Sequence, residues 1–478
     1  MPAAPSASYS ITARLEVPAG GRVVSQLTDA VESAGGSVTG LDVTASGHER
    51  LRVDVTMAAS STDHADELIE ALRGIDGVSI GKVSDRTFLM HLGGKIEMQS
   101  KHPIRNRDDL SMIYTPGVAR VCLAIAENPD DARRLTIKRN TVAVVTDGSA
   151  VLGLGNIGPK AALPVMEGKA ALFKRFAGID AWPICLDTQD PDEIVRAVQM
   201  MAPGFAGINL EDISAPRCFE IERRLRESLD IPVFHDDQHG TAIVVLAALT
   251  NALRVVGKKI EDVRLVMSGA GAAGTAILKL LLAAGLRDVV VADVHGVVHA
   301  GRDDLGEDLR WVAEHTNAQG LTGTLKQAVV GADVFVGVSA PNVIDAGDVA
   351  NMADDAIVFA LANPEPEIYP AVAQEHAAVV ASGRSDFPNQ INNVLVFPGV
   401  FRGLVDAQSR SITTDMLLAA ARALASVVTD EELNASYIVP SVFHPEVSNV
   451  VAAAVRDAVL ADRQAAGQPT GRAGGDKA

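Results

Sequence analysis

The sequence predicts an α/β protein with more than one domain. From about residue 100 to residue 462, apolar runs typical of buried strands, such as TVAVVTDG and GFAGINL, alternate with amphipathic helical stretches. Such alternation is typical of a mainly parallel sheet with helices on its faces. A glycine-rich turn beginning at Gly269 joins a strand to a helix, and the first ninety residues follow another pattern. At 478 residues the chain is too long for a single ordinary core.

Residues 1–90 read as a small α+β domain. Alternating apolar residues predict a strand around Tyr9–Val17, and two amphipathic helices and three further strands complete the order β-α-β-β-α-β. This is the order of a ferredoxin-like fold. Together with the VPAGG turn it resembles an ACT domain, a regulatory module that commonly pairs with a copy of itself to bind an amino acid or similar effector. The alternative is a domain that serves only to hold subunits together.

Two larger α/β domains follow, with predicted bounds of 91–238 and 239–462. Residues 463–478 are small, polar and rich in glycine, and we expect them to form a disordered tail.

Composition favours a cytoplasmic enzyme. The net charge of −18 argues against nucleic-acid and anionic-membrane partners, because both require clustered Lys and Arg. The three cysteines, Cys122, Cys185 and Cys218, lack CxxC spacing and fit free thiols in a reducing compartment. The N-terminus does not resemble a signal peptide, and the longest apolar stretches are too short and too polar at their ends to span a bilayer.

Two pairs of adjacent acids indicate a metal site. Glu211 and Asp212 follow the apolar run GFAGIN, and Asp236 and Asp237 follow IPVF, so each pair is expected at the carboxyl end of a buried strand. Carboxylates without neighbouring cysteines or paired histidines suit Mg²⁺ or Mn²⁺ better than Zn²⁺. Either pair alone would more simply cap the helix that follows it, but two pairs upstream of a dinucleotide fingerprint favour the metal.

That fingerprint is VRLVMSGAGAAG followed by the helical run TAILKLLLAAG. Gly269, Gly271 and Gly274 fit G-x-G-x-x-G, in which the glycines allow the turn, the approach of a pyrophosphate and helix packing. Asp293 ends the next strand, where an acid meets the adenosine ribose hydroxyls and favours NAD. Arg302 follows closely and could instead bind the 2′-phosphate of NADP, so the sequence leaves this choice open.

Two further side chains are candidates for proton transfer. Lys169 begins an apolar helical run, where a lysine usually extends its amine to water, but beside a dication and partly desolvated its pKa would fall and it could act as a base. Tyr114 lies on the Pro-Gly turn of SMIYTPGVAR, where a phenol can point into a cleft. By itself, this tyrosine would more simply be structural.

As a set, these motifs resemble those of the malic enzymes and are similar to the compact prokaryotic form. The motifs YTPGVA, GLGNIG, PVMEGKA, LEDI, HDDQHGTA, GAGAAG, LANPEPEI and NQINNVLVFPG occur in that family's order over roughly residues 92–460. The resemblance implies oxidative decarboxylation of L-malate to pyruvate and CO₂ with NAD or NADP and with Mg²⁺ or Mn²⁺. It also implies decarboxylation of oxaloacetate and a homodimer or higher homo-oligomer.

The resemblance also implies a role for each matching residue. Tyr114 matches the general acid, Lys169 the general base and Asp236 an acid that supports them. The expected metal ligands are Glu211, Asp212 and Asp237, and the expected substrate contacts are Asn363 and Asn393. Residues expected to contact the cofactor are Gly269, Gly271, Ala272, Ala273, Gly274, Asp293, Ser339 and Asn363.

One position departs from the family. Larger malic enzymes carry an arginine just before the glycine-rich LGLG-type loop, and this arginine clamps a substrate carboxylate. Here Ala150 stands in that place. We therefore expect Asn363, Asn393 and backbone N–H groups of the Gly153–Gly158 loop to hold the carboxylate instead.

Two other functions compete with this prediction. A metal-dependent 2-hydroxy-acid dehydrogenase would stop at the keto acid, but oxidation alone does not need a metal beside the base. A catalytically silent sensor of metabolites would have lost Lys169, Tyr114 or a metal ligand, and all of these are present.

Overall fold

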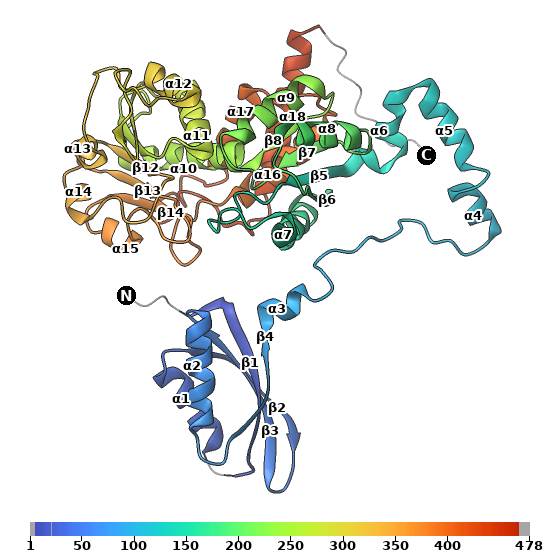
Figure 1. Ribbon diagram of the computed structural model, residues 1–478, viewed down its shortest axis with the longest axis vertical. Helices are drawn as coiled ribbons and strands as arrows, with labels where there is room; N and C mark the ends of the chain where they lie inside the picture. Colours follow the sequence, from blue (N-terminus) through green and yellow to red (C-terminus); the bar gives the residue numbers. More distant parts are fainter. Residues whose placement is uncertain (1–4, 21, 468–478) are drawn as a thin grey trace. The chain divides into compact units, whose positions relative to one another are not determined.

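The computed structural model describes residues 5–20 and 22–467 and divides into two compact units, residues 1–99 and 100–478. The first unit is a four-stranded antiparallel sheet with two helices on one face (Figure 1). Its strand order is β2-β3-β1-β4. Its elements are β1 (Ser6–Pro18), α1 (Val23–Ser33), β2 (Ser37–Ser46), β3 (Arg50–Ala59), α2 (Thr62–Arg73) and β4 (Ser79–Asp85). The predicted ferredoxin-like fold is therefore confirmed.

The core of this unit follows the alternation in the sequence. Leu15 of β1 is buried against Leu27 of α1 and Leu68 of α2. The other face of the sheet carries polar side chains, including the ion pair between Arg14 and Asp54. Among the described residues of this unit, α1 and α2 therefore cover only one face of the sheet.

The first sheet of the second unit is parallel, in the order β6-β5-β7-β8. It contains β5 (Thr141–Thr146), β6 (Asp180–Cys185), β7 (Gly207–Leu210) and β8 (Val233–His235), and its helices are α7 (Pro159–Ala177), α8 (Pro191–Met201) and α9 (Arg217–Ser228). Local signals set the helix starts. For example, Asp190 accepts hydrogen bonds from the N–H groups of Asp192 and Glu193, and Pro191 opens α8. Neighbouring parallel strands end at the same edge, so the residues after β7 and β8 meet.

The second sheet has the doubly wound order β11-β10-β9-β12-β13-β14. Its strands are β9 (Arg264–Ser268), β10 (Asp288–Asp293), β11 (Gly296–Val297), β12 (Val334–Gly337), β13 (Ile357–Ala360) and β14 (Val379–Ser382). All neighbours are parallel except the short β11, which forms a hairpin with β10. The helices around it are α11 (Ala272–Ala283), α12 (Glu307–His315), α13 (Leu325–Val329), α14 (Ala346–Ala350) and α15 (Pro370–Ala373). The predicted Rossmann-type domain is confirmed.

One continuous hydrophobic core joins the two sheets. It contains α10 (Thr241–Val256), α16 (Phe397–Asp406), α17 (Thr414–Ser426) and α18 (Val447–Ala465). The ring of Phe173 meets Phe397 edge-on at 4.7 Å between centroids, and Phe234 meets Phe401 at 5.6 Å. Residues from both predicted α/β domains therefore pack against the same helices, so the functional groups at the domain border are held by one core.

The C-terminal helix extends further than the sequence indicated. Since α18 ends at Ala465, the first residues of the predicted tail 463–478 are helical, and the start of that tail was predicted too early. Residues 468–478 lie outside the described part of the chain.

Two helical stretches are long and apolar enough to cross a membrane, Asp236–Val256 and Arg107–Glu127. The first contains α10, and 67 % of its most apolar window is buried, so it serves as a core helix. The second consists of α4 (Arg107–Ile113) and α5 (Val118–Glu127), neither of which buries a residue. We call residues 107–127 the α4–α5 arm. It packs mainly against η1 (Pro129–Asp131) and α6 (Ala132–Leu135), and Figure 1 shows it beyond α6.

Candidate functional site

The two acid pairs meet at the carboxyl edge of the first sheet. Glu211 and Asp212 follow β7, and Asp236 and Asp237 follow the adjacent β8 in a π-helical turn, η4 (Asp236–Gly240). Ligand atoms of Glu211, Asp212 and Asp237 lie within 4.8 Å of one another. The predicted cluster is therefore assembled by strand adjacency.

Lys169 of α7 reaches into this cluster. Its Nζ lies 2.6 Å from Oδ2 of Asp236 and 2.9 Å from Oε1 of Glu211, and its side chain is 10 % exposed. The same ammonium lies 4.2 Å from the ring centroid of Phe397, which adds a cation–π contact. The lysine that the sequence singled out is thus a buried neighbour of the acids.

The electrostatics are those of crowded like charges. Burial raises the pKa of Glu211 well above its usual value, and the neighbouring acids add to that shift against the opposing charge of Lys169. Burial and the charge of Asp237 raise the pKa of Asp212 to about 7. Burial alone would lower the pKa of Lys169, but the carboxylates of Asp236 and Glu211 outweigh it and raise that pKa. Without a cation, the cluster therefore holds Lys169 in its charged form.

Amides orient the acids. Asn393 begins the 3-10 turn η5 (Asn393–Leu395), and its Nδ2 donates to Oδ2 of Asp236 at 3.1 Å. Asn209, which the sequence analysis did not single out, donates from Nδ2 to Oε2 of Glu211 at 2.8 Å and is fully buried. A signal for it existed, because a polar residue two positions before Glu211 lies on the same face of the strand.

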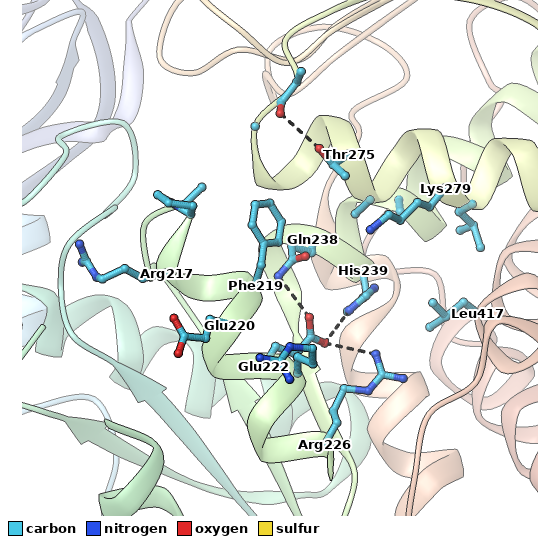
Figure 2. Close-up of a pocket in the computed structure, with 18 of the residues that line it drawn as sticks. Arg217, Phe219, Glu220, Glu222, Arg226, Gln238, His239, Thr275, Lys279 and Leu417 are labelled. Atoms are coloured by element: carbon cyan, nitrogen blue, oxygen red, sulfur yellow. Dashed lines mark hydrogen bonds and ion pairs between the residues drawn. The ribbon is translucent and has the colours of Figure 1, made fainter. Parts of the chain in front are cut away.

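A second set of buried polar groups supports the turn from behind. Glu222 of α9 accepts a hydrogen bond from Nε2 of Gln238 at 3.2 Å and bonds Nε2 of His239 at 2.6 Å (Figure 2). Arg226 approaches the same carboxylate at 3.7 Å. Burial alone would raise the pKa of Glu222, but the charge and hydrogen bond of His239 outweigh it and lower that pKa. Glu222 was also missed, since its partners are distant in sequence.

These contacts form one wall of a cavity of about 1290 Å³ between α9, η4, α11 and α17. Glu222, Gln238 and His239 therefore hold the acid-bearing turn in place from the side that borders this cavity (Figure 2).

The acids fit a hard divalent cation. Oδ2 of Asp212 and Oδ1 of Asp236 are buried and have no hydrogen-bond partner among the described residues. Unpaired buried carboxylate oxygens are costly, and a cation bound at Asp212 would remove that cost there. Glu211, Asp212 and Asp237 supply an all-oxygen donor set of the kind that Mg²⁺ and Mn²⁺ prefer.

The glycine-rich loop after β5 lies against the acids. The N–H of Ala150 donates to the backbone oxygen of Asp212 at 3.0 Å. Asp147, at the base of the loop, is fully buried in its side chain and pairs with Arg217 at 3.2 Å. Arg217 therefore fixes the base of this loop through Asp147.

The dinucleotide turn has the expected geometry. Gly269 has φ +105°, and a Cβ on Gly274 would lie 2.1 Å from the oxygen of Gly269, so neither position tolerates a side chain. A Cβ on Gly271 would meet nothing within 4 Å, and no side chain caps the start of α11. Ala272 and Ala273 form the first turn of that helix, and a helix N-terminus with open space beside it suits a pyrophosphate.

Two of the remaining predicted contacts lie at the edges of strands in the same sheet. Ser339 follows β12, and its hydroxyl lies 2.7 Å from that of Ser268 at the end of β9. Asn363 follows β13, and its backbone oxygen approaches Gly153 so closely that a Cβ there would lie at 2.8 Å. Asn363 therefore lies against the loop of Gly153–Gly158, as a contact to the substrate or cofactor requires.

Tyr114 is the one predicted catalytic residue that the structure does not bring to the cluster. It lies between α4 and α5, is 68 % exposed, and its hydroxyl makes no hydrogen bond to any described residue.

Comparison with known protein families shows to which family the chain belongs. The model of the malic enzyme N-terminal domain matches residues 93–226, and that of the malic enzyme NAD-binding domain matches residues 238–460. The chain belongs to the malic enzyme family. The resemblance predicted from the eight motifs is confirmed, whereas the ACT-like character of residues 1–90 stays a prediction.

Proteins with similar sequences are also named malic enzymes. The NAD-dependent malic enzyme of Geobacillus stearothermophilus is 58 % identical over 454 residues, which cover 95 % of both chains. The NADP-dependent malic enzyme of Escherichia coli is 46 % identical over 77 % of this chain and 50 % of its own. The crystal structure of the NAD-dependent malic enzyme from Thermotoga maritima is 48 % identical, with a TM-score of 0.75, over 78 % of this chain and 99 % of that one.

Malic enzymes oxidise and decarboxylate malate to pyruvate while reducing NAD or NADP, and this is the reaction of the present chain. The family assignment excludes the two competing predictions, a dehydrogenase that stops at the keto acid and a silent sensor.

Proton release provides a test of the acid cluster. Because the pKa of Asp212 is about 7 and that of Glu211 is raised, Mn²⁺ must displace protons below pH 7 and should bind more tightly as the pH rises. Calorimetric titration of Mn²⁺ in buffers of different ionisation enthalpy measures this. We expect about one proton released at pH 6 and fewer at pH 8. Equal affinity and no proton release at both values would contradict the raised pKa values.

Proposed function

We propose that this malic enzyme uses NAD in preference to NADP and binds Mg²⁺ or Mn²⁺ through Glu211, Asp212 and Asp237. The observation that carries the proposal is the buried amine of Lys169 among these acids, 2.9 Å from Glu211. A cation and a proton acceptor at one place suit the oxidation of a 2-hydroxy acid.

When bound, the cation supplies positive charge beside the oxygen atoms of the substrate, which favours loss of the C2 hydroxyl proton and stabilises the charge left after CO₂ departs. Asp236 has a separate task. Its Oδ2 accepts hydrogen bonds from Lys169 and Asn393, so this carboxylate aims the amine.

Lys169 is proposed as the general base. It would take the proton of the C2 hydroxyl, and NAD, when bound, would accept the hydride from C2. The amine must be neutral to do so, although the acids raise its pKa in the structure. A cation bound to Glu211 would weaken the attraction between that carboxylate and the ammonium of Lys169. It would also place a positive charge nearby, and both effects would lower the pKa of Lys169.

Tyr114 is proposed as the general acid that protonates C3 of enolpyruvate. Because it is exposed on the α4–α5 arm, we propose that it serves the acid cluster of a second copy of this chain. The arm supports this arrangement, since Leu110, Met112 and Leu123 are also exposed and large apolar surfaces mark contacts between proteins. The enzyme would then be a homodimer, or a higher oligomer built from such dimers.

Asn363 and Asn393 are proposed to hold the carboxylates of malate together with N–H groups of the Gly153–Gly158 loop. Asn393 already bonds Asp236, so one amide would link the substrate to the group that aims the base. These contacts replace the arginine whose place Ala150 takes.

The first unit is proposed as an ACT-like regulatory domain in a cytoplasmic enzyme. Its polar sheet face and free edges leave surfaces that a second copy of the unit can cover. An effector bound there would act by shifting how catalytic units are held, a coupling of about 1–3 kcal/mol.

The metal assignment is tested with isosteric variants. Glu211→Gln and Asp237→Asn should abolish malate oxidation and oxaloacetate decarboxylation together, because one cation serves both steps. Rates of both reactions are compared with those of Asp457→Asn, an exposed acid on α18. Oxaloacetate decarboxylation at the wild-type rate in either folded variant would show that the acids have another role.

Complementation tests the origin of the tyrosine. Lys169→Ala and Tyr114→Phe chains with different tags are co-expressed, and the hybrid is purified. If Tyr114 acts in a second copy, a hybrid dimer has one intact site and about half of the wild-type activity, while each variant alone is inactive.

A hybrid of Lys169→Ala with Asp237→Asn chains serves as the control. Lys169 and Asp237 belong to the acid cluster of their own chain, so each chain of this hybrid keeps a defective site and no activity is restored. An inactive Lys169→Ala and Tyr114→Phe hybrid would show that Tyr114 serves its own chain or no site.

Deletion of residues 1–90 tests the regulatory domain. The truncated enzyme should keep its metal site and its turnover and lose any response to small effectors. Malate saturation of both proteins is measured with and without candidate amino acids and acyl-CoA metabolites. Identical responses in both proteins would leave the domain an assembly element only.

A further inference from the structure

Three charged side chains form a closed group at the end of β10. Asp293 ends the strand, and Arg302 returns to it from the loop after β11. The NH1 and NH2 groups of Arg302 donate to Oδ1 and Oδ2 of Asp293, both at 2.9 Å. Its Nε donates to Oδ1 of Asp304 at 2.8 Å. The side chains of Arg302 and Asp293 are only 8 % and 14 % exposed.

This arrangement leaves Asp293 with little freedom. Its Oδ1 also accepts the N–H of His295 at 2.8 Å, so the carboxylate is held at both oxygens. A carboxylate offers about four acceptor sites, and those still open lie on Oδ2. Asp293 therefore presents a fixed oxygen to a ribose hydroxyl, and Arg302 sets its orientation.

Asp304 has a different effect, because it occupies the guanidinium from the other side. It accepts hydrogen bonds from Nε and NH2 of Arg302, so both sides of the guanidinium that offer two N–H donors are bonded to carboxylates. Arg302 therefore has no pair of donors left for a bidentate contact with a phosphate. Two carboxylates around one guanidinium also leave one negative charge uncompensated, which repels a 2′-phosphate.

The neighbouring residue indicates where the nucleotide lies. Val294, directly after Asp293 in the hairpin between β10 and β11, is 92 % exposed. An exposed apolar side chain beside the acid offers a surface on which an adenine ring can pack.

We propose that Asp293, Arg302 and Asp304 together decide between NAD and NADP, with Arg302 as the positioning residue for Asp293 and Asp304 as the lock that keeps Arg302 from a 2′-phosphate. The inference rests on the proposed dinucleotide site. It implies that removing the Asp293 carboxylate alone weakens NAD binding without creating a good NADP site. Removing the carboxylates of both Asp293 and Asp304 frees Arg302 to bind a 2′-phosphate.

Binding of the two adenosine halves tests this without turnover. Calorimetry with 5′-AMP and 2′,5′-ADP, which represent NAD and NADP, is carried out on the full-length wild type, Asp293→Ser, Asp304→Asn, the double variant and the double variant with Arg302→Met. Asp303→Asn, a change at the exposed acid between Arg302 and Asp304, is the matched control. Thermal unfolding checks that each variant is folded.

The wild type and the control should favour 5′-AMP. Asp293→Ser should bind 5′-AMP about ten-fold more weakly and gain little for 2′,5′-ADP, and the double variant should bind 2′,5′-ADP at least about ten-fold more tightly than the wild type. Arg302→Met should remove that gain. In the otherwise native chain, Arg302→Met should raise KM for NAD and leave kcat nearly unchanged, which loss of the fold would not do.

Two results would overturn the proposal in distinguishable ways. If 5′-AMP binds the wild type but the double variant gains no affinity for 2′,5′-ADP, or keeps its gain without Arg302, the role of these three residues is wrong. If neither nucleotide nor NAD binds the wild type, the proposed cofactor site fails, and this inference fails with it.

Discussion

Crowding of carboxylates at the ends of two adjacent parallel strands is the constraint on which the proposed active site depends. Because β7 and β8 are neighbours, the acids that follow them cannot move apart, and Lys169 is the one cation bonded to Glu211 and Asp236 within the described residues. The pKa values of Glu211 and Asp212 are raised because burial and the neighbouring carboxylates make their charged forms unfavourable. A fold retains such a cost where a bound cation offsets it, and the unpaired oxygen of Asp212 marks the place.

The surrounding packing keeps these groups in place. Phe397 lies beside the amine of Lys169 and also packs on Phe173, so the position of this amine depends on the core that joins the two sheets. Glu222 holds the π-helical turn through Gln238 and His239. The geometry of the proposed site and the stability of the fold therefore depend on the same residues. A change in Phe397 or Glu222 should disturb the acids although neither side chain is proposed to contact a substrate.

The sequence predicted most of what depends on local pattern. The acid pairs and the glycine turn could be placed because a strand end or a strand–helix junction fixes their surroundings within a few residues. Asn209 and Glu222 were missed because their partners come from side-chain packing between separate elements. Tyr114 was assigned by resemblance, and its exposure on the α4–α5 arm could not be anticipated, since local sequence does not say whether the rest of the fold covers a turn. Arg302 was noticed, but only the structure shows that two carboxylates already occupy it.

The central claim is that oxidation and decarboxylation of malate occur at one metal-containing cluster built around Lys169. The most direct measurement follows NADH and CO₂ together while the purified enzyme turns over L-malate with NAD and Mn²⁺. We predict equal amounts of both products, pyruvate as the organic product, and no activity after the cation is chelated. NADH formed without CO₂, with oxaloacetate accumulating, would contradict the account.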